Sequence, residues 1–312
     1  MFSISRGVWP TMVTPFTPTY EVDYAALERL VEWYIAKGVD GLFAVCQSSE
    51  MFHLSLDERV RIARIVKQCA GSRIPVIASG HVSDSAEEQQ KELQLMAQTG
   101  IDGLVLVTNR IAGPDTPEDV WRENLVSLLE GMNLDVPLGW YECPHPYKHL
   151  MSPERLKWCA EYKDFVFLKD TSCNIDSIKA KISAVHATNL KLFNANSATL
   201  LDSLKLGAAG FSGVMANIHP ELYVWLISNW RDQPKRAEKL MDFLSMASLL
   251  ETQLYPACAK YYLVLEGVLD NIACRSLLDC QFTDVQRLQV EQLRRLTHCV
   301  SDDVGISRSG SF

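Results

Sequence analysis

The chain has 312 residues, of which 47% are hydrophobic, and this is enough to bury a large core in one or two domains. Its formal net charge is −8 and no run of basic residues stands out, which argues against nucleic acid or an anionic membrane surface as a partner. No signal peptide and no apolar run of about 18 residues for a membrane span are visible, so we expect a soluble, cytoplasmic protein. The nine cysteines include no C-x-x-C motif, and we expect them to be reduced.

Short apolar runs alternate with amphipathic segments through the first 230 residues. The runs lie at 8–14, 40–45, 75–79, 102–108, 136–141, 165–169, 190–194 and 209–214. They are continuously apolar rather than alternating, which is typical of strands buried on both faces. The intervening segments begin near Ser or Asp and end at Gly, as helix caps do; the first three span 23–38, 55–71 and 83–100. Eight such units predict an α/β fold of the closed (β/α)8 TIM-barrel type.

The pattern changes after Trp230, where no further strand-like run occurs. Three helices are predicted there, near 233–252, 256–269 and 283–299, and they form a C-terminal appendage. We therefore expect two domains, a catalytic barrel over 1–232 and a helical domain over 233–312.

The ends of the fifth and sixth strands carry the strongest candidates for chemistry, because barrel enzymes place their active sites at the C-terminal ends of the strands. The sixth strand ends in Lys169 and the fifth in Tyr141. A buried lysine is biased toward its neutral form, which can attack a ketone to form a Schiff base. A lysine after an apolar strand more often extends to solvent, so the catalytic interpretation rests on the joint placement of the two residues.

Other polar residues near strand ends are candidates for binding the substrate. Serine hydroxyls after the second strand can hold a carboxylate, and Asn, Ser and Glu side chains can hold the hydroxyls of a sugar acid. The predicted substrate-binding residues are Gln47, Ser48, Ser49, Ser212, Glu142 and Asn196. The seven histidines form no H-E-x-x-H motif, and no G-x-G-x-x-G or phosphate-binding loop occurs, so we expect neither a metal nor another cofactor.

Several motifs together resemble one known family. They are TPF (14–16), PVIASG (75–80), YECP (141–144), FLKD (167–170) and LGAAGFSGVMAN (206–217). The chain is similar to the dihydrodipicolinate synthase/N-acetylneuraminate lyase family of class I aldolases from residue 7 to the helical tail. The resemblance implies that Lys169 forms the Schiff base and that Tyr141 is catalytic. It also implies pyruvate or a related keto acid and an aldehyde as substrates, and a homotetramer built as a dimer of dimers.

The chain also departs from the family pattern. The turn after the second strand, usually Gly-Thr-Thr-Gly-Glu or Gly-Ser-Thr-Gly-Glu, reads Cys46-Gln47-Ser48-Ser49-Glu50 here. The hydroxyl that normally works with the tyrosine is replaced by the Gln47 amide, which cannot relay a proton in the same way. The arginine that synthases place five residues after the tyrosine is Pro146, and the tyrosine after the fourth strand is absent from 109–111. Both losses argue against dihydrodipicolinate synthase itself.

Two classes of function remain open from the sequence. The first is a Schiff-base lyase or aldolase that interconverts a 2-keto acid, derived from a sugar acid, with pyruvate and an aldehyde. A dihydrodipicolinate synthase or a keto-acid dehydratase of the same family is the alternative within that class. The second is a catalytically impaired paralogue that binds keto acids, a hypothesis motivated by Gln47.

Overall fold

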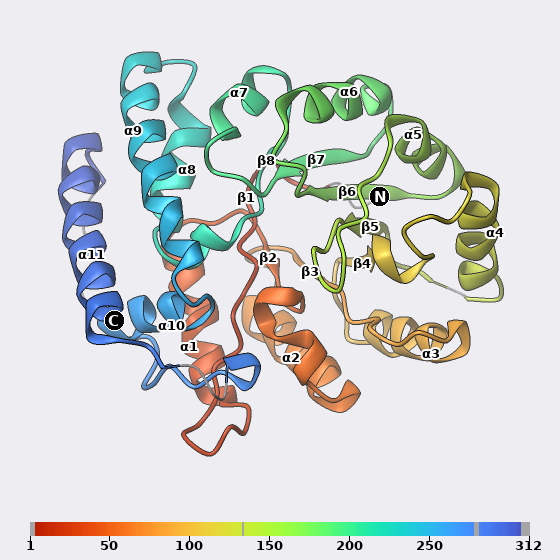
Figure 1. Cartoon of the computed structure of the whole chain (residues 1–312), viewed down its shortest axis with the longest axis horizontal. Coiled ribbons are helices and arrows are strands. Elements are labelled where there is room, and N and C mark those ends of the chain that lie inside the picture. Colours follow the sequence, from red (N-terminus) through yellow and green to blue (C-terminus); the bar gives the residue numbers. More distant parts are fainter. Residues whose placement is uncertain (1–3, 133, 278–280, 307–312) are drawn as a thin grey trace.

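Eight parallel strands form the centre of the molecule (Figure 1). The computed structural model describes residues 4–132, 134–277 and 281–306. Neighbouring strands follow the order β1-β8-β7-β6-β5-β4-β3-β2. Their bounds are β1 Gly7–Val8, β2 Leu42–Phe43, β3 Val76–Ala78, β4 Gly103–Val107, β5 Leu138–Tyr141, β6 Phe165–Asp170, β7 Lys191–Asn194 and β8 Gly210–Phe211.

The backbone just after β1 closes this sheet onto β2. Thr11 forms a parallel bridge with Phe43, the Met12 amide donates to the Phe43 carbonyl at 3.0 Å, and the Phe43 amide donates to the Pro10 carbonyl at 3.0 Å. Because β1 also pairs with β8, each strand has a neighbour on both sides. The predicted TIM barrel is thereby confirmed.

The helices between the strands form the outer layer of the barrel (Figure 1). Their bounds are α1 Tyr24–Ala36, α2 Leu56–Ala70, α3 Ala86–Ala97, α4 Glu118–Leu129, α5 Pro153–Tyr162, α6 Ile175–Val185, α7 Leu200–Lys205 and α8 Pro220–Asn229. The Asp23, Ser55 and Ser85 side chains accept hydrogen bonds from the first turns of α1, α2 and α3. Such caps satisfy amides that have no partner within the helix, which is why these helices begin where polar residues precede an apolar periodicity.

Aromatic rings fill the barrel below its C-terminal end. The ring of Phe167 lies 4.8 Å from that of Phe193, 6.0 Å from that of Phe43 and 6.1 Å from that of Trp9. Phe167 precedes Lys169 by two residues, so both side chains point to the same side of β6. The lysine therefore stands on an apolar floor that excludes water.

The C-terminal part contains the three predicted helices, α9 Pro234–Ala247, α10 Ala257–Leu265 and α11 Asp284–Val304. Helix α9 packs on α8, and α11 packs on α10 and α9 (Figure 1). One continuous hydrophobic cluster joins barrel residues such as Val31 to Leu244 and Val290 of these helices. The division into two domains at residue 232 stays a prediction. Within the described residues, no helix has the length and apolarity needed to cross a membrane.

Candidate active site

A cavity of about 610 Å³ opens at the C-terminal ends of the strands. Residues at strand ends and in the loops that follow them form most of its wall, and these include Gln47, Ser48, Glu50, Tyr141, Lys169, Thr171 and Asn196. A second wall comes from the C-terminal part of the chain, through Glu251, Thr252, Tyr255, Pro256, Ser276 and Leu277. The site thus combines barrel loops with part of the C-terminal helical segment, which the sequence predicts to be an appendage.

Lys169 and Tyr141 face each other inside this cavity. They are paired residues of adjacent strands, and the Lys169 Nζ atom lies 4.7 Å from the centre of the Tyr141 ring. Their exposed fractions are only 2% and 3%. Burial lowers the pKa of Lys169 to about 8, against opposing contributions from Cys46, Cys143 and Glu251. A large part of the amine is therefore neutral near pH 8, the form that attacks a carbonyl.

The Tyr141 phenol is held in its protonated form. Burial raises the pKa of Tyr141 well above its usual range, and the Cys143 and Cys46 thiols add to this effect. The Cys143 thiol in turn donates to Gln47 Oε1 at 3.3 Å. A neutral phenol beside a partly neutral amine can donate a proton to a developing alkoxide and recover it later, which is general acid–base chemistry.

The turn after β2 places Gln47 and Ser48 in the cavity wall, whereas the Ser49 side chain points to the protein backbone. It is a short 3-10 helix from Gln47 to Ser49. The Ser48 hydroxyl lies 3.3 Å from Thr11 Oγ1. The Ser49 hydroxyl instead accepts from the Cys46 amide at 3.1 Å and lies 2.8 Å from the Met12 carbonyl, so it holds the turn against β1.

Glu50 ends this turn in the left-handed backbone region and joins it to the C-terminal part. Its carboxylate accepts from Lys260 Nζ at 2.7 Å and from the Ser276 amide at 2.7 Å. Both partners of the Lys260–Glu50 pair have side chains that are 1% exposed. This buried link fixes the second wall of the cavity to the loop that follows β2.

Five of the eight residues predicted from sequence to form the site meet in the cavity. They are Lys169, Tyr141, Gln47, Ser48 and Asn196. Ser49, Ser212 and Glu142 are not part of its lining. The Ser212 hydroxyl donates to the Trp9 carbonyl at 2.9 Å. Glu142 follows Tyr141 directly, so strand alternation turns its side chain away from the barrel interior. A role for these three residues in substrate binding stays a prediction.

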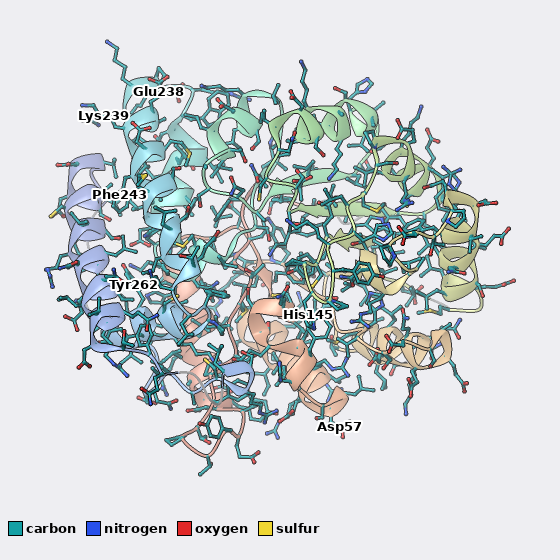
Figure 2. The ribbon with its side chains drawn as sticks, in the orientation of Figure 1. Asp57, His145, Glu238, Lys239, Phe243 and Tyr262 are labelled. Carbon is teal, nitrogen blue, oxygen red and sulfur yellow. The ribbon has the colours of Figure 1, made fainter. Side chains whose placement is uncertain are left out.

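Several cavity residues lie outside the eight predicted site residues. Lys148 lies in the loop after β5 and donates to the Thr171 carbonyl at 2.8 Å. His145, in the same loop, lies over the barrel with its ring 4.8 Å from that of Phe52 (Figure 2). Burial raises the pKa of the Glu251 carboxyl above its ordinary value, and the nearby Lys169 opposes only part of this rise. Glu251 does not follow a strand, so it could not be predicted from the placement of barrel active sites at the C-terminal ends of strands.

The described residues contain no group of three or more His, Cys, Asp or Glu side chains arranged to hold a metal ion. The cavity brings together the Lys169 amine, the Tyr141 phenol and polar side chains around them. A barrel that buries an amine of lowered pKa beside a phenol at its C-terminal mouth has the architecture of a Schiff-base-forming lyase.

Comparison with known proteins identifies the family. The sequence model of the Dihydrodipicolinate synthetase family matches residues 4–295, and the chain belongs to this family of Schiff-base aldolases, which are lyases. A 4-hydroxy-tetrahydrodipicolinate synthase of Chelativorans sp. (strain BNC1) is 29% identical over 286 residues, covering 91% of this chain and 96% of the relative. One of Acidiphilium cryptum is 29% identical over 264 residues, covering 84% of this chain and 88% of the relative.

Solved structures share the fold at lower identity. Dihydrodipicolinate synthase DapA-2 from Bacillus anthracis has a TM-score of 0.83 at 20% identity, covering 95% of this chain and 99% of that one. YagE, a prophage protein of E. coli K12 solved in complex with pyruvate, has a TM-score of 0.81 at 22% identity, covering 95% and 98%. CdNal from Clostridium difficile, solved in complex with mannosamine, has a TM-score of 0.82 at 19% identity, covering 94% and 99%.

Proposed function

We propose that the chain is a pyruvate-dependent lyase that uses Lys169 to form a Schiff base with a 2-keto acid derived from a sugar acid. The observation that carries the proposal is the buried Lys169 amine, with its lowered pKa, 4.7 Å from the centre of the Tyr141 ring. The relative named 4-hydroxy-tetrahydrodipicolinate synthase and the pyruvate complex of YagE support a keto acid as the substrate class.

The chemistry follows from these two groups. Neutral Nζ of Lys169 attacks the C2 carbonyl, and loss of water gives a protonated imine. Tyr141 then accepts the C4 hydroxyl proton while passing its own proton to the substrate carboxylate, and the C3–C4 bond breaks. The bonding electrons move into the imine to give an enamine, and the aldehyde leaves. Protonation of the enamine at C3 and hydrolysis release pyruvate and free Lys169. Condensation is the same sequence in reverse.

Cavity polarity supports a hydroxylated substrate. In the cavity wall, Asn196 and Thr252 offer amide and hydroxyl groups, and Glu251 offers a carboxyl group. Carboxylates and amides are suited to the hydroxyls of a polyhydroxy chain. The Ser48 hydroxyl and the Gln47 amide are the proposed contacts for the keto-acid carboxylate.

Trapping with borohydride tests the proposal directly. The protein is incubated with millimolar pyruvate and reduced, and the adduct is located by peptide mass spectrometry. We expect one stable adduct on Lys169. Absence of an adduct would favour the rival hypothesis of a paralogue that binds keto acids without turnover. A screen of 2-keto acids with detection of released pyruvate then identifies the full substrate.

The rate of imine formation is expected to rise as the pH increases through about 8. The sign follows from the lowered pKa of Lys169, because only the neutral amine is a nucleophile and its fraction grows until the pH exceeds that pKa. The measurement is the initial rate of borohydride trapping at sub-saturating pyruvate between pH 6 and 10. A rate that still rises steeply near the ordinary lysine pKa of about 10.4 would show that Lys169 is not desolvated.

Condensation of pyruvate with aspartate semialdehyde is a second candidate activity, favoured by Lys148. Pro146 stands where synthases have an arginine for the acceptor carboxylate, but the Lys148 ammonium is part of the cavity wall and could meet that carboxylate instead. The names of the Chelativorans and Acidiphilium relatives agree with it. A coupled assay with aspartate semialdehyde separates this activity from sugar-acid cleavage.

Gln47→Thr is expected to change activity on the native keto acid by less than loss of the Tyr141 hydroxyl does. Gln47 contacts the Cys143 thiol and cannot itself ionise, so a proton path through this position is already absent. We also expect that the variant gains no synthase activity, because the acceptor arginine is still missing. Steady-state kinetics on both substrates measures this. Efficient condensation with aspartate semialdehyde by the variant or the wild type would instead assign acceptor binding to Lys148.

We also propose that the protein is a cytoplasmic homotetramer, a dimer of dimers. The exposed apolar side chains of Val285, Leu288 and Leu296 on α11 support association. One protein of the same fold is described as a monomeric variant of dihydrodipicolinate synthase. Light scattering on the purified chain distinguishes the two states.

A further inference from the structure

Each of the two proposed catalytic residues is followed by a buried carboxylate. Glu142 comes directly after Tyr141, and Asp170 comes directly after Lys169. Side chains alternate along a strand, so these carboxylates point away from the cavity, toward the helix layer. Both side chains have exposed fractions of 0%. The ends of β5 and β6 thus carry the proposed catalytic groups on the inner side and two buried acidic groups on the outer side, where burial and Asp170 raise the pKa of Glu142 to about 7.

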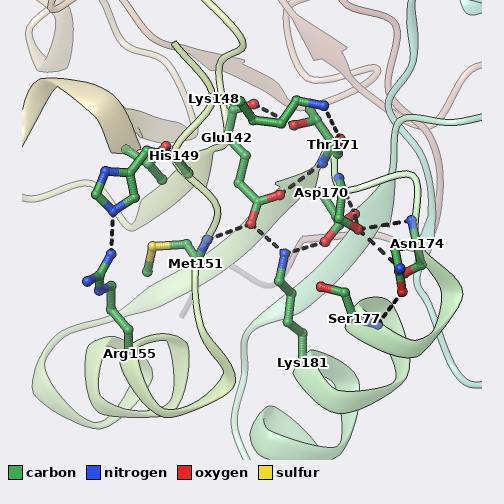
Figure 3. A network of polar contacts seen from close by, with 12 residues as sticks. Glu142, Lys148, His149, Met151, Arg155, Asp170, Thr171, Asn174, Ser177 and Lys181 are labelled. Atoms are coloured by element: carbon green, nitrogen blue, oxygen red, sulfur yellow. Dashed lines mark hydrogen bonds and ion pairs between the residues drawn. The ribbon is translucent and has the colours of Figure 1, made fainter. Parts of the chain in front are cut away.

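Lys181 of α6 lies between the two carboxylates (Figure 3). Its Nζ atom is 2.5 Å from Glu142 Oε1 and 2.6 Å from Asp170 Oδ2, and its side chain is 1% exposed. Burial alone would lower the pKa of Lys181, but the two carboxylates outweigh it and raise that pKa. Lys181 is therefore a charged cross-link between two adjacent strand ends. Because both carboxyl groups are buried, solvent could not compensate for the loss of the Lys181 ammonium.

The same network extends to the wall of the cavity. Glu142 Oε2 accepts from the Thr171 amide at 2.9 Å, and the Glu142 carbonyl accepts from the Thr171 hydroxyl at 2.7 Å. Lys148 then donates to the Thr171 carbonyl, and both Thr171 and Lys148 border the cavity (Figure 3). Glu142 Oε1 also accepts from the Met151 amide at 2.8 Å. A shift at Lys181 would therefore reach both catalytic strand ends and the loop above them.

We propose that Lys181 is a positioning residue that fixes the Lys169 amine against the Tyr141 phenol by holding together the ends of β5 and β6. The inference rests on the proposed Schiff-base function and deepens it, since Lys181 touches no substrate. The strand pairing alone is weaker at this point, because the Glu142 amide lies 3.3 Å from the Lys169 carbonyl. Lys181 reinforces that contact from the outer side with two charge-assisted hydrogen bonds.

Lys181→Met tests the proposal, because it keeps the length and most of the packing of the side chain but removes the charge. We expect kcat to fall roughly 10- to 100-fold, since a misplacement of about 1 Å can cost that much. KM should change less than kcat, because Gln47 and Ser48, the proposed contacts for the keto-acid carboxylate, lie in the turn after β2 and outside the Lys181 network. Lys181→Arg, which keeps the charge, should recover part of the lost kcat.

A second readout needs no substrate. The rate at which Lys169 reacts with acetic anhydride, followed by peptide mass spectrometry across a pH series, gives the pKa of its amine. The groups that influence this amine are Tyr141, Cys46, Cys143 and Glu251. In Lys181→Met the strand ends should loosen and admit water, so the midpoint should move upward from about 8 toward the ordinary lysine value.

Arg59→Met is the matched control. The Arg59 guanidinium lies 3.0 Å from Glu92, their side chains are 6% and 4% exposed, and Glu92 accepts from the Val82 amide after β3. This ion pair is buried at the same end of the barrel but holds neither catalytic strand. Its loss should lower the Tm as Lys181→Met does, while leaving kcat and the labelling midpoint of Lys169 unchanged.

Two outcomes would overturn the proposal. One is a Lys181→Met protein with a lowered Tm but wild-type kcat and an unshifted Lys169 midpoint, which would make Lys181 a structural residue only. If Lys181→Met does not fold, Glu142→Gln replaces it, because this variant keeps the side-chain shape and leaves Lys181 paired with Asp170. An unshifted midpoint in Glu142→Gln would be the second contradicting outcome. If the wild-type protein formed no adduct with pyruvate, the proposed function would be refuted. The acetic anhydride labelling of Lys169 would still decide the role of Lys181.

Discussion

Lys169→Ala is expected to abolish turnover while leaving the fold intact. Without the amine no imine can form, and the bond-breaking step loses its electron acceptor. We expect no pyruvate adduct after borohydride reduction and less than about a few per cent of wild-type kcat. Lys169→Arg should fail equally, because guanidinium stays protonated and is not a nucleophile. The measurements are steady-state release of pyruvate and intact-protein mass after trapping.

The thermal stability of Lys169→Ala provides a control, because the direction of its change can be predicted. Lys169 is buried and its pKa is lowered, so at pH 7 the folded state must hold an ammonium that is better solvated in the unfolded chain. Lys169→Ala should therefore have a Tm at or above that of the wild type at pH 7. Lys148→Ala, which removes the other lysine of the cavity, should still be trapped with pyruvate. Clear residual turnover by Lys169→Ala, or an adduct on Lys148, would contradict the assignment.

The sequence was sufficient to predict the barrel because local and global signals agree in it. Continuous apolar runs such as 165–169 fit strands covered on both faces, and caps such as Ser55 coincide with the observed starts of helices. The predicted strands at the second and eighth positions were longer than β2 and β8, which have two residues each. At these positions the chain soon leaves the ladder to form the loops of the active site.

The candidate site could be predicted only where it follows strand ends. Lys169 and Tyr141 were found because parallel strands bring their last residues to one mouth. Glu142 lies outside the cavity lining, because the residue that follows Tyr141 in a strand lies on the opposite face. Ser49 also lies outside the lining, because its hydroxyl forms hydrogen bonds with backbone groups of the turn and of the segment after β1. Glu251 was missed because its approach to the cavity depends on how the C-terminal helices dock, which no local pattern encodes.

Tyr141→Phe is expected to lower kcat by roughly 10²- to 10⁴-fold with a small change in KM, the range typical of lost general acid–base catalysis. The substitution keeps the ring, which packs 5.7 Å from that of Phe43 and 4.7 Å from the Lys169 amine, so the cavity should keep its shape. It removes only the buried hydroxyl proposed to carry the proton. Steady-state kinetics on the native keto acid, with pyruvate trapping in parallel, measures both effects.

Tyr255→Phe provides the comparison, because Tyr255 borders the same cavity and its hydroxyl interacts with Ser48 and lies 3.2 Å from Asn217 Nδ2. Its kcat should fall far less than that of Tyr141→Phe. Equal losses of kcat in the two variants would mean that both hydroxyls only maintain the shape of the cavity. A Tyr141→Phe enzyme with unchanged kcat and a raised KM would make Tyr141 a binding residue. The proton would then have to pass through the substrate itself or through another group near Gln47, such as the Cys143 thiol.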